Sequence, residues 1–291
     1  GATATPPGQD AAPPTPAVTP TTAPPGETPS VDTPTVAPAA TALQDVRLDW
    51  TGNEELQRKA FNGQTNYFSA GVSDGTEASY RASLGNAQII HRTPEGAETL
   101  ASYATRGWQV SATGLANNAG RRQIARLYGG SGVLQDDGSA TIQWSGAFTV
   151  NFYGPLIPFT LTNPVLTIAA DGTGTLKANL SGYGSDINTP DVKAPLTPVD
   201  GVTVATLTGA ALSPSSPVTL SPAFAGVTVT TQGGEPPQNT AAPGWGAWPQ
   251  SFVDFQVQTG LGSYWYTAGG AADPYKAPYP FTVTPNSPKP A

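Results

Sequence analysis

Residues 165–180 read Val165-Leu-Thr-Ile-Ala-Ala-Asp-Gly-Thr-Gly-Thr-Leu-Lys-Ala-Asn-Leu180. Apolar and polar side chains alternate on both sides of the central Asp171-Gly172 pair. A period of two is typical of a strand with one buried face. Asp-Gly between two such runs favours a tight hairpin turn, because glycine adopts the positive φ that these turns need. The stretch therefore predicts an antiparallel β-hairpin.

Similar alternating runs recur along the chain, separated by turn residues such as Asp136-Asp-Gly138, Asn163-Pro164 and Asp200-Gly201. The one good helix-forming run is Asn53–Ala60. The pattern predicts an all-β fold, a single β-sandwich or barrel-like domain of about eleven short strands with one short helix. The predicted strands are Val46–Trp50, Gln88–His91, Arg122–Leu127, Ala140–Trp144, Phe148–Tyr153, Val165–Ala169, Gly174–Leu180, Val202–Leu207, Val227–Thr231, Phe252–Val257, Tyr264–Tyr266 and Phe281–Val283.

Composition supports this fold class and excludes several kinds of site. Only 11% of residues are charged, and 33 Gly and 31 Pro suit many short strands and turns. The net charge of −7, without a cluster of Lys or Arg, argues against binding to nucleic acid or to an anionic membrane surface. The chain has no Cys, which excludes disulfides, thiolate metal sites and Cys nucleophiles. It also contains no apolar run long enough to span a bilayer.

The first part of the chain differs from the rest. Residues 1–40 hold eleven prolines and no basic residue. Each proline fixes φ and removes a hydrogen-bond donor, so we expect an extended arm or stalk. The predicted organisation is a Pro/Thr-rich arm over 1–42, a β domain over 43–285 and a Pro-rich tail over 286–291. Gly1-Ala-Thr-Ala suits a mature N-terminus left after signal-peptide removal, so we expect an extracellular or cell-surface protein.

Aromatic residues are concentrated in Trp245–Tyr266. Such a cluster either closes a core or builds a binding face, because each ring buries a large area. If Tyr264-Trp265-Tyr266 is a strand, Trp265 points into the core and the two tyrosines share the opposite face. That face either meets a ligand or packs against Asp273–Phe281. The residues predicted to form a structural cluster are Trp245, Trp248, Phe252, Phe255 and Trp265. Further candidate ligand-binding residues are Tyr153 and Tyr67, each beside another aromatic segment.

No catalytic motif is evident. His91 is the only histidine, and its place at the end of a predicted strand favours a solvent or turn position. No Ser stands in a Gly-x-Ser-x-Gly context, and Glu54-Glu55 has the pattern of an exposed helix start. A glycosidase pair stays open, because its two acids can be distant in sequence. We therefore expect a protein that is not an enzyme and has no metal site.

Four motifs are shared with a known family: Leu48-Asp-Trp50, Phe148–Pro164, Trp248-Pro-Gln-Ser-Phe-Val-Asp-Phe255, and Tyr264-Trp-Tyr-x-x-Gly-Gly-x-x-Asp-Pro274. Over residues 43–285 the chain resembles the HtaA domain of actinobacterial surface proteins. The resemblance implies a secreted or envelope-attached β-rich domain with one or two short helices. It also implies a link to haem, which some members bind through a tyrosinate on the iron, supported by a histidine.

The haem ligands of that family are not matched here. Its ligand tyrosine follows the opening Trp in a Ser-Phe-x-x-Tyr setting, and the corresponding stretch of this chain, Glu55–Ala60, has no Tyr. Its histidine stands in a Gly-His-x-Gly setting, and the corresponding Phe152–Leu156 has no His. Ferric haem needs a strong axial ligand. A rebuilt site would have to use Tyr67, Tyr153, Tyr264 or Tyr266, with His91 in support.

Three functional hypotheses follow. The first is a non-enzymatic surface module that acts as a structural or interaction subunit without a cofactor. Its expected partners are other subunits or cell-wall and envelope components, held through residues 1–42. The second is a haem-binding surface domain for iron acquisition. The third is a glycan-binding module, because Trp and Tyr rings stack on sugars.

Overall fold

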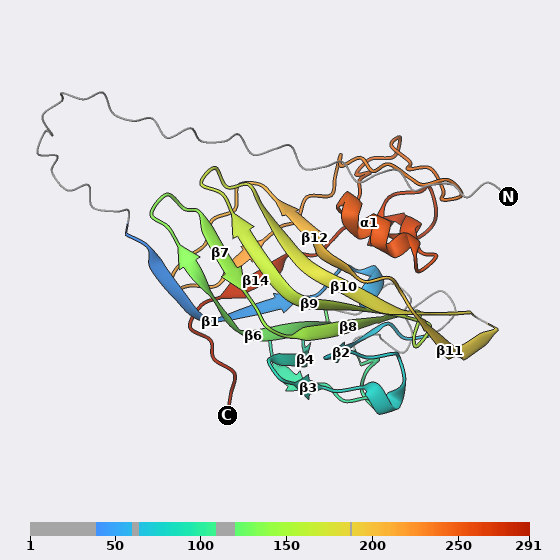
Figure 1. The fold of residues 1–291 in the computed structure, drawn as a ribbon, viewed down its shortest axis with the longest axis horizontal. Helices are drawn as coiled ribbons and strands as arrows, with labels where there is room; N and C mark the ends of the chain where they lie inside the picture. Colours follow the sequence, from blue (N-terminus) through green and yellow to red (C-terminus); the bar gives the residue numbers. More distant parts are fainter. Residues whose placement is uncertain (1–38, 60–63, 109–119, 187) are drawn as a thin grey trace, which may run out of the picture. The chain divides into compact units, whose positions relative to one another are not determined.

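The computed structural model describes residues 39–59, 64–108, 120–186 and 188–291 (Figure 1). These residues form an antiparallel sheet, so the predicted all-β class is confirmed. The strands are β1 (Thr41–Trp50), β2 (Tyr67–Ala70), β3 (Ser83–Leu84), β4 (Ala87–Arg92), β5 (Glu98–Leu100), β6 (Arg122–Leu134), β7 (Ala140–Gln143), β8 (Ala147–Phe152), β9 (Ile157–Ile168), β10 (Gly174–Asp186), β11 (Thr189–Pro195), β12 (Val199–Leu207), β13 (Val218–Leu220) and β14 (Phe281–Thr284). The predicted arm lies almost wholly outside the described residues, and β1 begins at its end, at Thr41.

Helical structure is sparse in the described residues. They contain one α-helix, α1 (Gln250–Val257), and four separate short 3₁₀ turns. The turns are η1 (Glu55–Gln57), η2 (Glu77–Ser79), η3 (Gly262–Trp265) and η4 (Asp273–Tyr275).

The sheet branches because its long strands change partners along their length. Its main path runs β11-β10-β9-β7-β6-β1-β14-β13. The first half of β6 pairs with β4 and its second half with β7. Likewise, β9 pairs first with β8 and then with β7. The described path ends at β11 and β13, so the predicted barrel-like closure is replaced by an open, branched sheet.

The hairpin predicted from residues 165–180 is present between β9 and β10. Ile168 pairs with Gly174, and the two strands stay in register to Phe159 and Gly182 apart from one bulge. Asp171 Oδ1 accepts a hydrogen bond from the Thr173 amide at 2.9 Å, and Gly172 has a φ of +85°. The Asp-Gly pair therefore supplies both the side-chain acceptor and the positive φ that the turn requires.

The core is filled by large side chains, and central strands such as β2 and β8 are buried on both faces. Trp50 packs against Phe68 and Phe148, with ring centroids 5.7 and 5.3 Å apart. Trp144 donates its indole N–H to Val46 O at 2.9 Å. A side chain at Gly130 would collide with this indole ring, so that position of β6 needs glycine for close packing.

Three predicted strands near the C-terminus are wrong. Residues 252–257 lie in α1, residues 264–266 lie in and just after η3, and residues 227–231 have no regular structure. The stretch after Pro249 is helical because Phe252, Phe255 and Gln256 fall at i, i+3 and i+4 and face the core together. The positions of the apolar residues in so short a run are compatible with either a helix or a strand, and the predicted strand is wrong.

Two further corrections concern the helices. The helix predicted over Asn53–Ala60 is only the single turn η1, after which Arg58 is extended; Ala60 lies outside the described residues. The α-helix instead lies beside β12, where Ser251 Oγ accepts a hydrogen bond from the Thr203 amide at 2.9 Å (Figure 1). This contact covers an edge amide of β12 that would otherwise face solvent.

Candidate functional site

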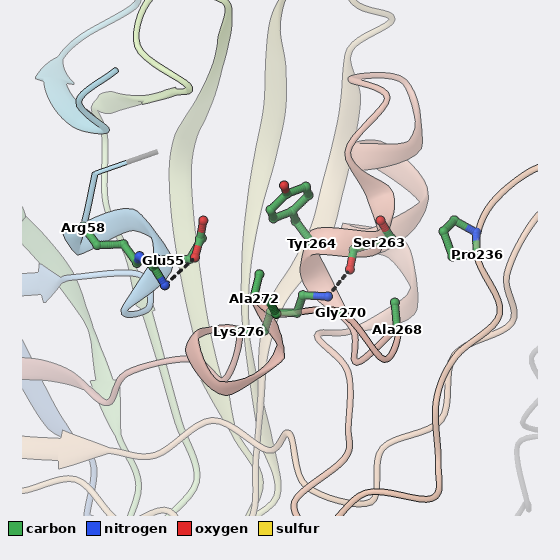
Figure 2. A pocket seen from close by; sticks show the side chains of 10 residues that line it. Glu55, Arg58, Pro236, Ser263, Tyr264, Ala268, Gly270, Ala272 and Lys276 are labelled. Carbon is green, nitrogen blue, oxygen red and sulfur yellow. Dashed lines mark hydrogen bonds and ion pairs between the residues drawn. The ribbon is translucent and has the colours of Figure 1, made fainter. Parts of the chain in front are cut away.

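A pocket of about 520 Å³ lies between η1 and the segment that carries η3 and η4 (Figure 2). We call it the Glu55 pocket. Its lining combines small residues with one aromatic ring and three charged side chains. The lining residues are Glu55, Arg58, Pro236, Ser263, Tyr264, Ala268, Gly270, Ala271, Ala272 and Lys276.

The carboxylate of Glu55 is the most unusual group in this pocket. The residue is only 5% exposed, and its Oε2 atom accepts no hydrogen bond. The nearest cation is Arg58, whose Nη1 lies 3.7 Å from Oε2 (Figure 2). Burial raises the pKa of Glu55, while the positive charges of Arg58 and Lys276 oppose that shift. The predicted exposed helix start is therefore wrong, and Glu55 is a buried acid beside an open cavity.

Buried amide side chains hold η1 in place. Asn53 accepts the Leu56 amide at 2.9 Å and donates to Lys276 O at 3.1 Å. Gln57 donates to Gln123 O at 2.8 Å and accepts the Gln123 amide at 3.0 Å. These bonds tie η1 to β6 and to the C-terminal segment, so the backbone that carries Glu55 is fixed on two sides.

Lys276 is a buried cation with a full set of partners. Its Nζ donates to Ser263 O, Tyr266 O and Asp273 Oδ1, at 2.8, 2.9 and 2.8 Å. An ammonium has three donors, so this lysine is fully satisfied. It clamps η4 onto η3 and leaves its positive charge close to Glu55.

Tyr264 lines the pocket, and its hydroxyl forms a hydrogen bond with that of Tyr153. Tyr153 follows β8 with a φ of 59°, and its amide donates to Asn66 Oδ1 at 2.8 Å. Burial raises the pKa of Tyr153 well above its usual range, and the hydrogen bond with Tyr264 adds to the shift. Both predicted ligand tyrosines are therefore brought together, and Tyr153 is held as a neutral phenol.

The other predicted ligand residues lie elsewhere. Tyr266 is 1% exposed and donates to Pro236 O at 2.6 Å, so it does not share an open face with Tyr264 as the predicted strand required. Tyr67 is buried beside Tyr80 and Tyr103, and its hydroxyl donates to Gly75 O at 3.1 Å.

His91 is not at a solvent-exposed strand end as predicted. It is buried within β4 and stacks on Trp108, with ring centroids 5.0 Å apart. Burial lowers its pKa to about 4, so the imidazole is neutral at physiological pH.

The predicted aromatic cluster is mostly core. Trp248, Phe252, Phe255 and Trp265 are buried, whereas Trp245 is half-buried. Trp265 lies 4.8 Å from Phe252 and 4.9 Å from Trp248 between ring centroids. Trp248 also donates its indole N–H to Lys276 O at 2.7 Å. The cluster forms the wall behind the Glu55 pocket and supports η3 and η4.

Sequence reasoning missed three residues of the pocket: Glu55, Arg58 and Lys276. Glu55 and Arg58 stand in what has the pattern of a solvated helix, and Lys276 in a Pro-rich segment. The available signal was the spacing of Asp273 and Lys276 within Asp273-Pro-Tyr-Lys276. Charged residues three apart on a turn pair with each other, as these two do.

The described residues do not supply the haem ligands implied by the HtaA resemblance. The stretch expected to carry the axial tyrosine places Glu55 and Arg58 in the pocket lining, and the stretch expected to carry the histidine places Tyr153 against Tyr264. Tyr153 has a raised pKa, and its hydroxyl is bonded to that of Tyr264. His91 is not among the residues that line the pocket.

Comparisons with known proteins give one structural likeness. No protein-family model matches the sequence, and no curated protein matches it. Among solved structures, the chain is similar to the C-terminal domain of HtaA from Corynebacterium glutamicum, at 13% identity and a TM-score of 0.34. The match covers 84% of this chain and 99% of that chain.

The described residues lack two further features, a membrane-spanning helix and a cluster of metal-binding side chains. None of their helices has the length and apolar character needed to cross a membrane. They also contain no group of three or more His, Cys, Asp or Glu side chains arranged to hold a metal ion.

Proposed function

We propose that this chain is a non-enzymatic surface module that binds a small ligand in the Glu55 pocket. The observation that carries this proposal is Glu55, which lines the pocket and whose buried Oε2 atom accepts no hydrogen bond. Leaving a buried acceptor unpaired costs about 1–3 kcal/mol, and more for a charged group. A ligand that donates a hydrogen bond to Glu55 would recover this free energy on binding. The pocket therefore favours ligands that carry a hydrogen-bond donor.

The groups around the pocket favour binding over catalysis. Lys276 is held by three acceptors and is not a free amine nucleophile. Tyr153 is kept protonated by burial and by Tyr264. Glu55 is the one carboxylate among the described lining residues, whereas glycoside hydrolysis needs two facing acids.

The surface location rests on the sequence. It is supported by the Pro/Thr-rich composition of residues 1–42. The interactions expected of that arm, with other subunits or envelope components, fall on residues 1–38, which lie outside the described residues.

The binding role is tested by screening a fragment library against ¹⁵N-labelled protein by NMR. The pocket-blocking variant is Ala271→Trp, because Ala271 is exposed at the pocket and a bulky ring there fills it. The matched control is Ala241→Trp, at an exposed loop position outside the lining. We expect saturable shifts around Glu55 and Tyr264 that disappear only in Ala271→Trp. If no fragment perturbs these residues, or if both variants bind alike, the pocket is not a ligand site.

Hemin is included in the same series to test the haem hypothesis directly. The stretches expected to carry the family's ligand tyrosine and histidine lack both residues, so we expect no saturable one-to-one change in the Soret band. A saturable change that is lost in Tyr264→Phe and Tyr153→Phe would instead assign the pocket to haem.

A further inference from the structure

We propose that the ligand of the Glu55 pocket is a neutral, polyhydroxylated ring, such as a sugar, with adjacent hydroxyls bridging Glu55 and Arg58. This inference rests on the proposed binding function and adds the chemical class of the ligand. Charge balance, the arrangement of donors and acceptors, and the shape of the apolar wall each support it.

The charges around the pocket cancel. Glu55 lies 3.7 Å from Arg58, and Asp273 lies 2.8 Å from Lys276. An organic cation that approached Glu55 would meet Arg58, and an anion that approached Arg58 would meet Glu55. Repulsion between like charges at this range opposes either ligand. The site therefore favours a molecule without net charge.

The donors and acceptors at the site are adjacent but unused. The 3.7 Å between Nη1 of Arg58 and Oε2 of Glu55 is too long for a hydrogen bond. Nε of Arg58 also has no partner, and its guanidinium is held 3.9 Å from the ring centroid of Tyr275. A hydroxyl is the common neutral group that both donates and accepts. One hydroxyl would donate to the Glu55 carboxylate while its neighbour accepts from the Arg58 guanidinium.

The remaining wall suits the apolar face of a ring. Tyr264 lines the pocket together with the small residues Ala268, Gly270, Ala271 and Ala272 (Figure 2). Small residues let a flat molecule approach the backbone closely, and the tyrosine offers a broad apolar surface. Small-molecule sites are commonly of this type, apolar with a few placed polar groups, and 520 Å³ lies within their usual size range.

Binding is measured by saturation-transfer NMR and calorimetry with four probe classes. They are neutral methyl glycosides and short oligosaccharides, their O-methylated analogues, small organic amines, and small carboxylates. We expect saturable binding of at least one neutral sugar, loss of binding on O-methylation, and little change in affinity with added salt, because no net charge is neutralised.

Glu55→Gln is the diagnostic variant, and Glu54→Gln is its matched control. Both remove one carboxylate from the same short segment, but only Glu55 lines the pocket. We expect sugar affinity to fall at least tenfold in Glu55→Gln and to stay within twofold in Glu54→Gln, with thermal melts checking that both variants fold.

The outcomes separate the ligand class from the binding role. If an amine, a carboxylate or an O-methylated sugar binds as well as the free sugar, or if Glu54→Gln and Glu55→Gln bind alike, the neutral-hydroxyl assignment is wrong while the pocket remains a binding site. If no probe binds and the fragment screen also leaves the pocket unperturbed, the binding role itself is wrong.

Discussion

His91 is the single histidine of the chain, and burial against Trp108 lowers its pKa to about 4. In the unfolded chain its pKa is about 6.5, so between these values the unfolded state binds more protons. Stability is therefore complete above about pH 6.5 and falls as the pH drops toward 4, by at most roughly 3 kcal/mol. Urea unfolding of wild type and His91→Phe at pH 7 and pH 4.5 measures this.

The His91→Phe variant keeps an aromatic ring on Trp108 but cannot be protonated. We expect its loss of stability between the two pH values to be smaller than that of the wild type, because the carboxylates titrate equally in both proteins. Equal losses would mean that the imidazole is solvated at low pH.

Glu55 titrates in the opposite sense. Burial raises its pKa in the folded state, so its contribution to stability is present below the unfolded value near 4.3 and is lost as the pH rises through the folded value. We expect Glu55→Gln to raise the free energy of unfolding at pH 7 relative to wild type, and this gain to vanish near pH 4. Denaturant melts at both pH values measure it. A destabilised variant at pH 7 would show that the carboxylate is stabilised by Arg58 and Lys276.

At the scale of elements, η1 depends on one side chain of β6. Gln123 accepts the Phe68 amide at 2.8 Å and donates to Leu56 O and Asn66 O at 3.0 and 3.1 Å. Gln123→Leu leaves three buried backbone groups without these partners. At about 1 kcal/mol or more for each group, we expect a loss of roughly 3 kcal/mol in the free energy of unfolding.

The matched control for Gln123→Leu is Gln88→Leu, the same change on the neighbouring strand β4. Gln88 makes only an exposed contact with Ser83, so its loss is expected to stay within about 0.5 kcal/mol. Chemical denaturation of the two variants decides the point. Similar losses in both would indicate a general cost of leucine in this sheet and no special role for Gln123.

The sequence predicts best those elements whose hydrophobic pattern is long and regular. The β9–β10 hairpin was predicted because alternation and an Asp-Gly turn are both local signals. The helix α1 was misread because Phe252 and Phe255 are compatible with both periods over so short a run, and only the core contacts decide between them.

Predictability of the site was poorer because its contacts are distant in sequence. Tyr153 and Tyr264 meet across 111 positions, and Asn53 reaches Lys276 across 223. Nothing near Glu55 in the sequence indicates that a carboxylate there is buried. The aromatic segment indicated the region of the pocket, because it contains the lining residue Tyr264, but it did not indicate the charged lining residues.

At the scale of the whole β domain, the two ends of the described chain meet. β14 lies between β1 and β13, pairing Val283 with both Leu48 and Val218. Just beyond it, the amides of Asn286 and Ser287 donate to Gln44 O and Asp45 O. The last strand therefore completes the sheet around the first, and the C-terminal segment before it carries η4 and Lys276 to the pocket.

Because β14 pairs with both β1 and β13, we expect that a chain ending at Pro280 will not fold cooperatively. The truncation removes β14 and with it Phe281, which is 1% exposed. The segment Arg47–Asp49 of β1 then loses its partner, and so does β13. Burial of one Phe side chain contributes about 1.5–3 kcal/mol. With the lost pairing, the total approaches the 5–15 kcal/mol that stabilises a typical domain. Circular dichroism melts and amide exchange measure the effect.

A chain ending at Pro288 keeps β14 and the Asn286 and Ser287 bonds, so we expect it to melt within a few degrees of the full chain. A cooperative transition in the chain ending at Pro280 would show instead that β1 is held in the sheet by β6 alone.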